Sequence, residues 1–254
     1  MLSEMLPEGI VTDRAWLAER GFSRHAIDNL VKSNGLTSLH HGVYVRGIIA
    51  AQWQAVVFSL QSLLDTDLVV GGLTALEIQG FAHYLSLSNK KVIHVYGSDK
   101  LPTWVDSLIP DISFVWHNSK DLAGRGSRSA TNQPLQAFVE AHEWREGLPS
   151  LVLSSPERAF LELLADVPEK ISFEHADHVM QGMTSLSPRA LQPLLESTDN
   201  VKVKRLFFWL ADRHKYPWLQ KLDKEKIEFG AGNRMLLKGG KFDKEYLISV
   251  PHSL

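Results

Sequence analysis

The feature that most constrains the fold is the order of four short segments within residues 12–46. A first helix ends at Gly21, and glycine is the residue that most often follows a helix C-terminus. Ser23 then begins a second helix over residues 24–32, because a serine side chain accepts hydrogen bonds from free backbone amides at a helix start. The i, i+3, i+4 spacing of its apolar residues predicts one buried face, formed by Ile27, Leu30 and Val31.

Two short strands follow this helix pair, at Leu36–Leu39 and Val43–Arg46, on either side of a turn that contains Gly42. The order of helix, tight turn, helix and hairpin is typical of a winged helix-turn-helix. We therefore expect residues 1–47 to form an N-terminal domain of this kind. The alternative is a small helical cap that packs on the rest of the chain.

The second helix and the hairpin both present polar side chains that suit DNA. In a winged helix the second helix lies in the major groove, and the hairpin reaches phosphates or the minor groove. The alternatives are a polar face that is merely solvated, and a winged helix that binds a protein instead of DNA. The candidate DNA-binding residues are Ser23, Arg24, His25, Asp28, Asn29 and Lys32 on the helix, and His40, His41, Tyr44 and Arg46 in the hairpin.

Residues 48–254 alternate between helical and strand-like patterns, with a possible subdivision near residues 150–200. Ser155 caps one helix, and proline and glutamate follow it in the first turn, where both are favoured. The sequence therefore predicts an α+β (mixed α/β) fold, in which an N-terminal winged helix-turn-helix precedes a larger mixed α/β domain. Three strand-like pieces end the chain, at Lys226–Phe229, Met235–Leu237 and Tyr246–Val250.

Charge is distributed unevenly along the chain. The whole protein has a formal net charge of −2, but residues 202–244 contain 12 Lys or Arg against five Asp or Glu. Such a segment is either a solvated face or a surface for an anionic partner, which could be nucleic acid or an acidic protein. The candidate residues for an anion or partner surface are Lys202, Lys204, Arg205, Arg213, Lys215, Arg234, Lys238 and Lys241.

The residue types present exclude several kinds of chemistry. The chain contains no cysteine, so disulfides, thiolate zinc sites and a cysteine nucleophile are excluded. His175 and His178 lie three residues apart, but no third ligand follows at a spacing typical of a metal site. The HExxH, Gly-x-Ser-x-Gly and Walker signatures are absent. We expect no metal, no cofactor and no enzymatic activity.

A metal-dependent nuclease is a third possible function, besides DNA binding and protein binding by the winged helix. Asp111 precedes the strand Ile112–Trp116, as the first acid of a nuclease core would. That chemistry needs a second acid and a lysine on the following strand to hold Mg²⁺ and polarise water. The residues after Asp111 do not supply this pair, so the sequence favours a nuclease least of the three functions.

The location of the protein is expected to be cytoplasmic. No apolar run approaches the roughly 20 residues that a helix needs to span a bilayer. Residues 1–12 contain Glu4 and Glu8 and lack the basic and apolar regions of a signal peptide. The absence of cysteine also suits a reducing compartment. We expect no contact with membranes.

Several short motifs, in this order along most of the chain, resemble the AbiEi-type antitoxins, which are transcriptional regulators of type IV toxin–antitoxin systems. The match begins in the winged helix, with Leu30 to Leu36 and His41-Gly42-Val43-Tyr44. It continues through Gly72-Leu73-Thr74-Ala75-Leu76, Ser154-Ser155-Pro156-Glu157-Arg158-Ala159 with Leu163-Leu164, and the segment from Gly230 through Gly239-Gly240-Lys241 to Val250-Pro251.

The resemblance implies a DNA-binding autorepressor that also acts as an antitoxin. The winged helix would bind inverted repeats in double-stranded DNA of its own promoter, as a monomer or a dimer. Residues 48–254 would form the antitoxin domain, which counters a nucleotidyltransferase-like toxin encoded beside it. Direct contact with that toxin is left open. His40 and His41 stand where the family suggests Arg or Lys, which implies a phosphate contact that is weaker or pH-dependent.

Overall fold

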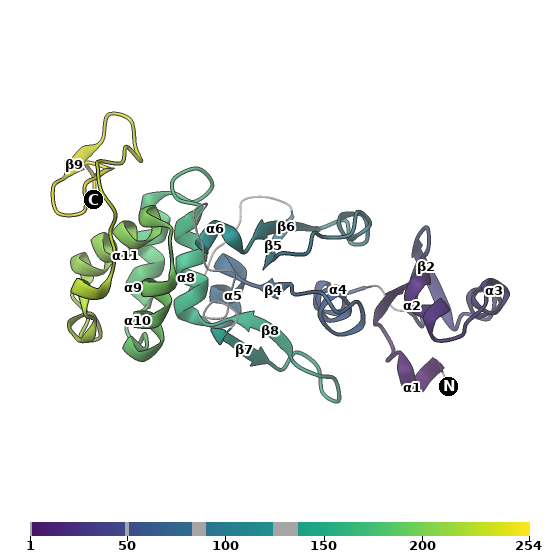
Figure 1. The fold of residues 1–254 in the computed structure, drawn as a ribbon. Helices are drawn as coiled ribbons and strands as arrows, with labels where there is room; N and C mark the ends of the chain where they lie inside the picture. Colours follow the sequence, from purple (N-terminus) through teal and green to yellow (C-terminus); the bar gives the residue numbers. More distant parts are fainter. Residues whose placement is uncertain (1, 49–50, 83–89, 124–136) are drawn as a thin grey trace. The chain divides into compact units, whose positions relative to one another are not determined.

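The computed structural model describes residues 2–48, 51–82, 90–123 and 137–254 (Figure 1). The chain has an α+β fold, as predicted, and divides into two compact units. Within the described ranges, no helix is long and apolar enough to cross a membrane. The first unit comprises Met1–Val70, Ser86–Trp116 and Ala141–Val152, and the second comprises Gly71–Leu85, His117–Glu140 and Leu153–Leu254.

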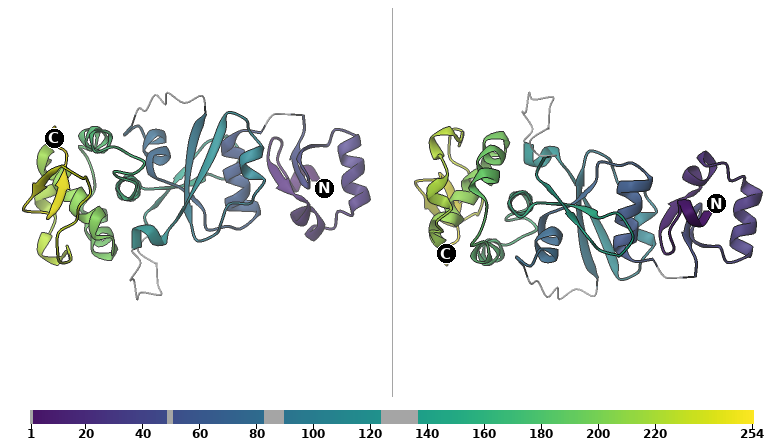
Figure 2. Two further views of the ribbon diagram at one scale, coloured as in Figure 1. Left: turned by 90° about the horizontal axis from the view of Figure 1, so that it is seen from above. Right: turned by 90° about the horizontal axis from the view of Figure 1, so that it is seen from below.

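The N-terminal part of the first unit is a winged helix-turn-helix, drawn in purple in Figures 1 and 2. Its small antiparallel sheet has the strand order β1-β3-β2, so a strand that precedes both main helices completes the wing. The sequence pattern does not predict β1. The elements are α1 (Leu2–Met5), β1 (Val11–Asp13), α2 (Arg14–Glu19), α3 (Arg24–Lys32), β2 (Leu36–His40) and β3 (Val43–Arg46).

Local interactions explain where these helices and the hairpin begin and end. The Asp13 side chain caps α2 by accepting a hydrogen bond from the backbone N–H of Trp16 at 2.8 Å. Ser23 caps α3 in the same way, at 3.2 Å from the N–H of Ala26. Gly21 separates the two helices at a φ of +85°, which a side chain would disfavour. The predicted helix over residues 24–32 is confirmed.

The rest of the first unit is built on a five-stranded sheet with the order β6-β5-β4-β8-β7. Gln61 joins two segments of it, because its amide nitrogen donates to the carbonyls of Leu68 and Val152, each at 2.9 Å. Some strand ends pass into the second unit. The elements are α4 (Trp53–Phe58) with a π-helix (Ser59–Leu63), β4 (Val69–Val70), β5 (Lys91–Gly97), a 3₁₀ turn (Val105–Ser107), β6 (Ile112–Asn118), β7 (Val139–His142) and β8 (Leu151–Ser154).

The second unit is mostly helical and ends in a two-stranded antiparallel ribbon. Its core is rich in aromatic side chains, and Phe207 contacts Phe160, Phe208 and Trp218 with ring centroids 5.3–6.3 Å apart. The elements are α5 (Gly72–Ile78), α6 (Lys120–Ala123), α8 (Pro156–Ala165), α9 (Phe173–Gly182), α10 (Pro188–Ser197), α11 (Val201–His214), 3₁₀ turns at Leu219–Lys221 and Lys224–Lys226, β9 (Lys241–Asp243) and β10 (Ile248–Val250).

Two of the three strands predicted near the C-terminus are wrong. Lys226 ends a 3₁₀ turn and residues 227–229 form no strand, and Met235–Leu237 is not a strand either. Side chains satisfy the backbone there in place of a strand ladder, because Ser249 Oγ accepts the N–H groups of Leu236 and Leu237 at 2.8 and 2.9 Å. The third prediction is confirmed in part, since β10 covers Ile248–Val250.

Candidate nucleic-acid interface

Helix α3 has one buried side and one polar, exposed side. Ile27 is buried against the small sheet, and Leu30 and Val31 are partly covered. Ser23 is exposed at the start of the helix, where its hydroxyl is occupied by the N-cap hydrogen bond. The other helix residues that are predicted to bind DNA are all exposed on α3: Arg24, His25, Asp28, Asn29 and Lys32.

The wing divides into exposed and structural residues. His40 and His41 are exposed at the turn between β2 and β3. Tyr44 is only 5% exposed, and its hydroxyl lies 3.4 Å from Arg14, whose guanidinium donates to it. Arg46 donates to the carbonyl of Leu6 at 3.0 Å. Tyr44 therefore does not fit the expected direct contact with DNA, and Arg46 stabilises the module from within.

Lys202, Lys204 and Arg205 do not form the expected anion surface. Lys202 Nζ donates to the carbonyls of Ala165 and Val167, at 2.6 and 2.7 Å. Burial lowers the pKa of both Lys202 and Lys204. Their position on α11 explains the error, because charge counted along a helix does not distinguish its buried side from its exposed side.

Arg205 is 1% exposed and holds the C-terminal segment to α11. Its guanidinium donates to four backbone carbonyls at 2.7–3.3 Å, and burial lowers its pKa. A planar fork of five donors suits such a cluster of acceptors. The carbonyls belong to Phe229, Gly230, Gly232 and Leu247.

The remaining candidates of the basic segment lie at the surface. Arg213 donates to Asp177 at 3.1 Å, so its charge is partly compensated within the second unit. Lys215 is exposed at the end of α11 in a left-handed conformation, with a φ of +53°. Arg234, Lys238 and Lys241 are exposed around β9 and the loop before it.

The motif at Ser154–Ala159 forms a buried polar network rather than a surface site. Ser155 caps α8, and Glu157 accepts the N–H of Ser187 at 2.8 Å. Glu162 accepts hydrogen bonds from Arg158 at 2.8 Å and from the N–H of Gly72 at 2.9 Å. These contacts join the starts of α5, α8 and α10, so the motif stabilises the second unit.

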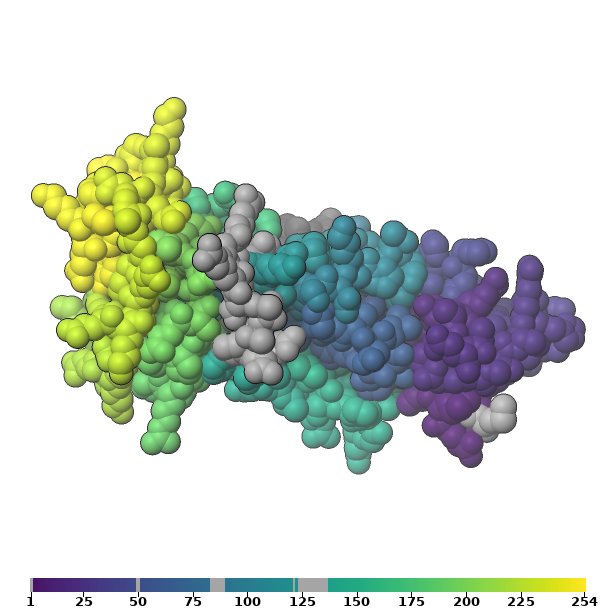
Figure 3. Space-filling view, viewed as in Figure 1, coloured from purple at the N-terminus to yellow at the C-terminus, as the bar shows by residue number. Residues whose placement is uncertain are grey.

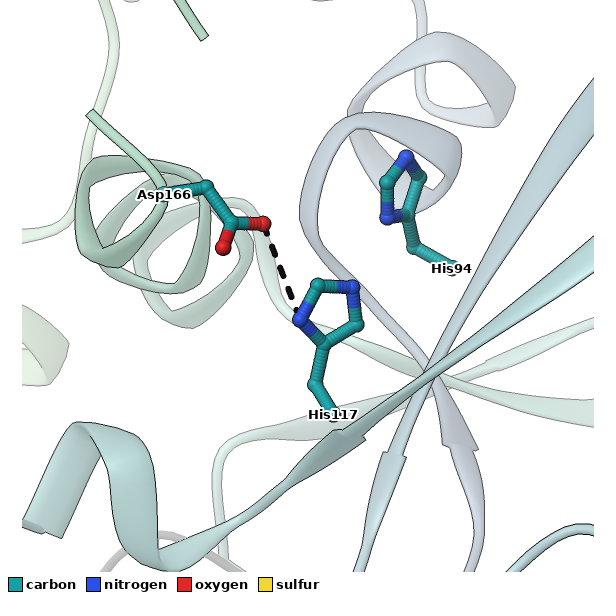
Figure 4. Close-up of side chains that lie close together, drawn as sticks. All are labelled: His94, His117 and Asp166. Atoms are coloured by element: carbon teal, nitrogen blue, oxygen red, sulfur yellow. Dashed lines mark ion pairs between the residues drawn. The ribbon is translucent and has the colours of Figure 1, made fainter. Parts of the chain in front are cut away.

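Several histidines also take part in interactions within the second unit. His117 is buried with its Nδ1 3.6 Å from a carboxylate oxygen of Asp166, and Figure 4 marks this ion pair with a dashed line. Asp166 also accepts from Lys170 at 2.9 Å. His175, which was considered as a metal ligand, has its pKa lowered by burial and by the neighbouring His178.

Comparisons with known proteins agree with a transcriptional regulator. A family model described as the N-terminal domain of the AbiEi antitoxin transcriptional regulator matches residues 1–87. A second model, described as a transcriptional regulator and AbiEi antitoxin of a type IV toxin–antitoxin system, matches residues 89–251. The chain belongs to the AbiEi antitoxin family. The boundary at residue 47 stays a prediction.

The fold is also found in a solved structure. The chain resembles the crystal structure of the RV2827C protein from Mycobacterium tuberculosis with a TM-score of 0.51 and 17% sequence identity. The match covers 94% of this chain and 85% of that one, so the likeness extends over nearly the whole fold. A comparison of the sequence with curated proteins finds no match.

Proposed function

We propose that this regulator represses its own operon by binding inverted repeats in the promoter through the winged helix. The observation that carries the proposal is the polar, exposed side of α3, which stands on a buried apolar base. A helix of this kind fits the major groove of B-DNA, with its N-terminal residues toward the base edges. The chain acts as a monomer or as a dimer on its DNA.

The side chains of α3 and of the wing take different roles in this proposal. Arg24 and Asn29 read base edges, since both residue types form paired hydrogen bonds with purines. Lys32 contacts a phosphate, and His40 and His41 bring the wing tip to the DNA backbone. His25 and Asp28 lie on the same face and complete the contact surface.

The second half of the function is countering a toxin. The family description places the chain in a toxin–antitoxin system, and we propose a nucleotidyltransferase-like toxin as its counterpart. The antitoxin role and the promoter role both operate in the cytoplasm. Neither role requires catalysis, a metal or a cofactor, so we propose that the protein is not an enzyme.

Fluorescence anisotropy with labelled DNA from upstream of the operon tests the DNA-binding proposal. Arg24→Ala and Asn29→Ala should each weaken binding at least about tenfold, which corresponds to the loss of one good base contact. Arg189→Ala, an exposed arginine on α10, is the matched control and should bind as the wild type does. Affinity should also fall steeply with salt concentration.

Two results would overturn the proposal. Unchanged affinity for promoter DNA in both α3 variants would show that α3 does not contact the bases. No binding of the wild-type protein to any upstream fragment would favour the alternative in which the winged helix binds a protein. Circular dichroism of each variant checks that its fold is retained.

A further inference from the structure

Arg14, the first residue of α2, lies between the wing and helix α3. Its backbone N–H donates to the carbonyl of Gly42 in the turn of the wing at 2.8 Å, and its Nη2 donates to the hydroxyl of Tyr44 at 3.4 Å. The interaction with Tyr44 raises the pKa of the Arg14 guanidinium, and the negative charge of Asp28 on α3 adds to this effect. Arg14 therefore stands beside the wing and within the electrostatic reach of α3.

Asp28 identifies the side of α3 that Arg14 borders. Arg24, Asp28 and Lys32 follow one another at intervals of four residues, so they share one side of the helix, and all three are exposed. Figure 3 shows the winged helix in purple, with side chains that project from its surface. The side that Asp28 occupies is the one assigned to DNA above, so Arg14 lies at the border of the proposed contact surface.

The Arg14 side chain, which is partly exposed, uses little of its hydrogen-bonding capacity within the described residues. A guanidinium carries five N–H donors. In the described parts of the chain, its only side-chain hydrogen bond is the one to Tyr44, and it forms no ion pair. Its Nε is buried without a partner, so an external acceptor would meet the two terminal nitrogens. Arginine binds phosphate oxygens through such paired donors.

Tyr44 gives the guanidinium a fixed acceptor. It is 5% exposed and lies on β3, the central strand of the small sheet, opposite Thr12 of β1 and Ser38 of β2. A buried ring on a central strand holds its hydroxyl in one place, and this hydroxyl accepts from Arg14. A side chain that is oriented before binding loses less entropy when its partner arrives.

We propose that Arg14 binds a phosphate of the DNA backbone that passes between α3 and the wing, and that Tyr44 positions it. The inference rests on the DNA-binding function proposed above and adds a phosphate contact to it. A sugar–phosphate backbone separates the major groove of B-DNA from the minor groove. A helix in the major groove and a wing beside it must straddle this backbone, and Arg14 lies between the two elements. Tyr44 then acts through Arg14 and does not itself touch DNA.

A purely structural role for Arg14 explains fewer of these observations. The arginines that stabilise this fold make shorter or more numerous contacts, since Arg46 donates to the Leu6 carbonyl at 3.0 Å and Arg205 donates to four carbonyls. A single hydrogen bond at 3.4 Å is long for its kind. The backbone N–H of Arg14 already joins α2 to the wing, and most other residue types would supply that group equally well. The charge of the side chain is therefore available to a partner.

Fluorescence anisotropy of the full-length chain over a range of salt concentrations tests this inference, on the upstream fragment and on an unrelated fragment of equal length. Arg14→Gln should weaken binding to both fragments about tenfold and make the slope of log K against log salt shallower by about 0.9, because one phosphate contact is lost. Arg14→Lys keeps the charge and should keep the wild-type slope. Arg24→Ala should instead weaken binding to the upstream fragment more than to the unrelated one. Arg189→Gln, the matched control on α10, should change neither affinity nor slope.

Tyr44→Phe tests the positioning role, because it removes only the hydroxyl that accepts from Arg14. It should weaken DNA binding about threefold in the wild-type chain and should have no further effect in the Arg14→Gln variant. Additive losses in the double variant would overturn this role of Tyr44. Circular dichroism of each variant checks that its fold is retained.

The same measurements separate this inference from the proposed function. Unchanged affinity and slope in Arg14→Gln, while Arg24→Ala and Asn29→Ala lose binding, would overturn the phosphate contact alone. A loss of affinity in Arg14→Gln with the wild-type slope would also overturn it, because that result indicates a structural role. No binding of the wild-type chain to any upstream fragment would overturn the proposed function together with this inference.

Discussion

The guanidinium of Arg158 lies 2.8 Å from the carboxylate of Glu162, one helical turn further along α8, and both side chains are buried. The second carboxylate oxygen of Glu162 accepts the N–H of Gly72 at the start of α5. Ser154 donates to the first oxygen at 3.1 Å. The pair therefore stabilises the packing of α5 on α8, provided that both of its members are present.

Arg158→Ala should destabilise the protein by about 3–5 kcal/mol, because it leaves the Glu162 carboxylate buried without a cation. Urea denaturation followed by circular dichroism measures this loss. The matched control is Lys170→Ala, which removes an i, i+4 ion pair with Asp166 in which the lysine is half exposed. That change should cost no more than about 1 kcal/mol. Equal losses in the two variants would contradict the structural role of Arg158.

Arg205→Lys should loosen the C-terminal segment, because an ammonium group cannot reproduce the planar fork that reaches four carbonyls. We expect a loss of about 2 kcal/mol and faster amide hydrogen exchange around Gly232 and Leu247. Arg189→Lys, at an exposed position of α10, should change neither quantity appreciably. Unchanged exchange in Arg205→Lys would show that other contacts hold the segment.

Asp67 should make stability depend on pH in the acid range. Burial acts to raise its pKa, but hydrogen bonds from Ser98 and Asp99 outweigh burial and lower the pKa below its ordinary value of 3.8. A carboxylate whose pKa is lower in the folded than in the unfolded state stabilises the folded state at pH values above its unfolded pKa. This stabilisation is lost as pH falls through the folded pKa.

Asp67→Asn should therefore be less stable than the wild type at pH 6, and the difference should shrink toward pH 2. Urea midpoints measured across this range give the comparison. Asp65→Asn changes an exposed carboxylate two residues away in the same loop and serves as the control. A difference between wild type and Asp67→Asn that is constant over the range would contradict the role of the charged form.

His41→Arg should strengthen promoter binding, because arginine brings a permanent positive charge and five donors to the exposed wing tip. One added phosphate contact should steepen the slope of log K against log salt by about 0.9. Gln220→Arg, an equal charge change in the second unit, is the control for net charge. An equal slope of log K against log salt in both variants would show that the wing does not contact DNA.

The sequence predicted the winged helix because its signals are local. Ser23, the apolar spacing of α3 and Gly42 each act within a few residues, and the structure contains α3, β2 and β3 as predicted. Strand β1 was missed, although Val11 and Thr12 are β-branched, because a three-residue strand gains its stability from pairing with the distant β3. Such pairing leaves little trace in the sequence.

The candidate sites were also hard to predict, because burial depends on contacts between distant segments. The charge count along the chain indicates a basic surface that includes Lys202, Lys204 and Arg205, but the packing of α11 buries Lys204 and Arg205. The strand predicted over Met235–Leu237 also gave no sign that Met235 is 76% exposed, because an apolar residue type suggests burial. Whether a side chain is buried depends on which helix or loop covers it, and the covering segment is often distant in the sequence.

Site-directed crosslinking tests the central claim, that α3 reads DNA in the major groove, most directly. The chain contains no cysteine, so a single introduced cysteine is the only thiol. His25→Cys, exposed near the start of α3, should form a disulfide with a thiol tethered to a major-groove base of the operator, once footprinting has located it. Arg189→Cys on α10 should not. Equal crosslinking at both positions, or none at position 25 despite full affinity, would contradict this account.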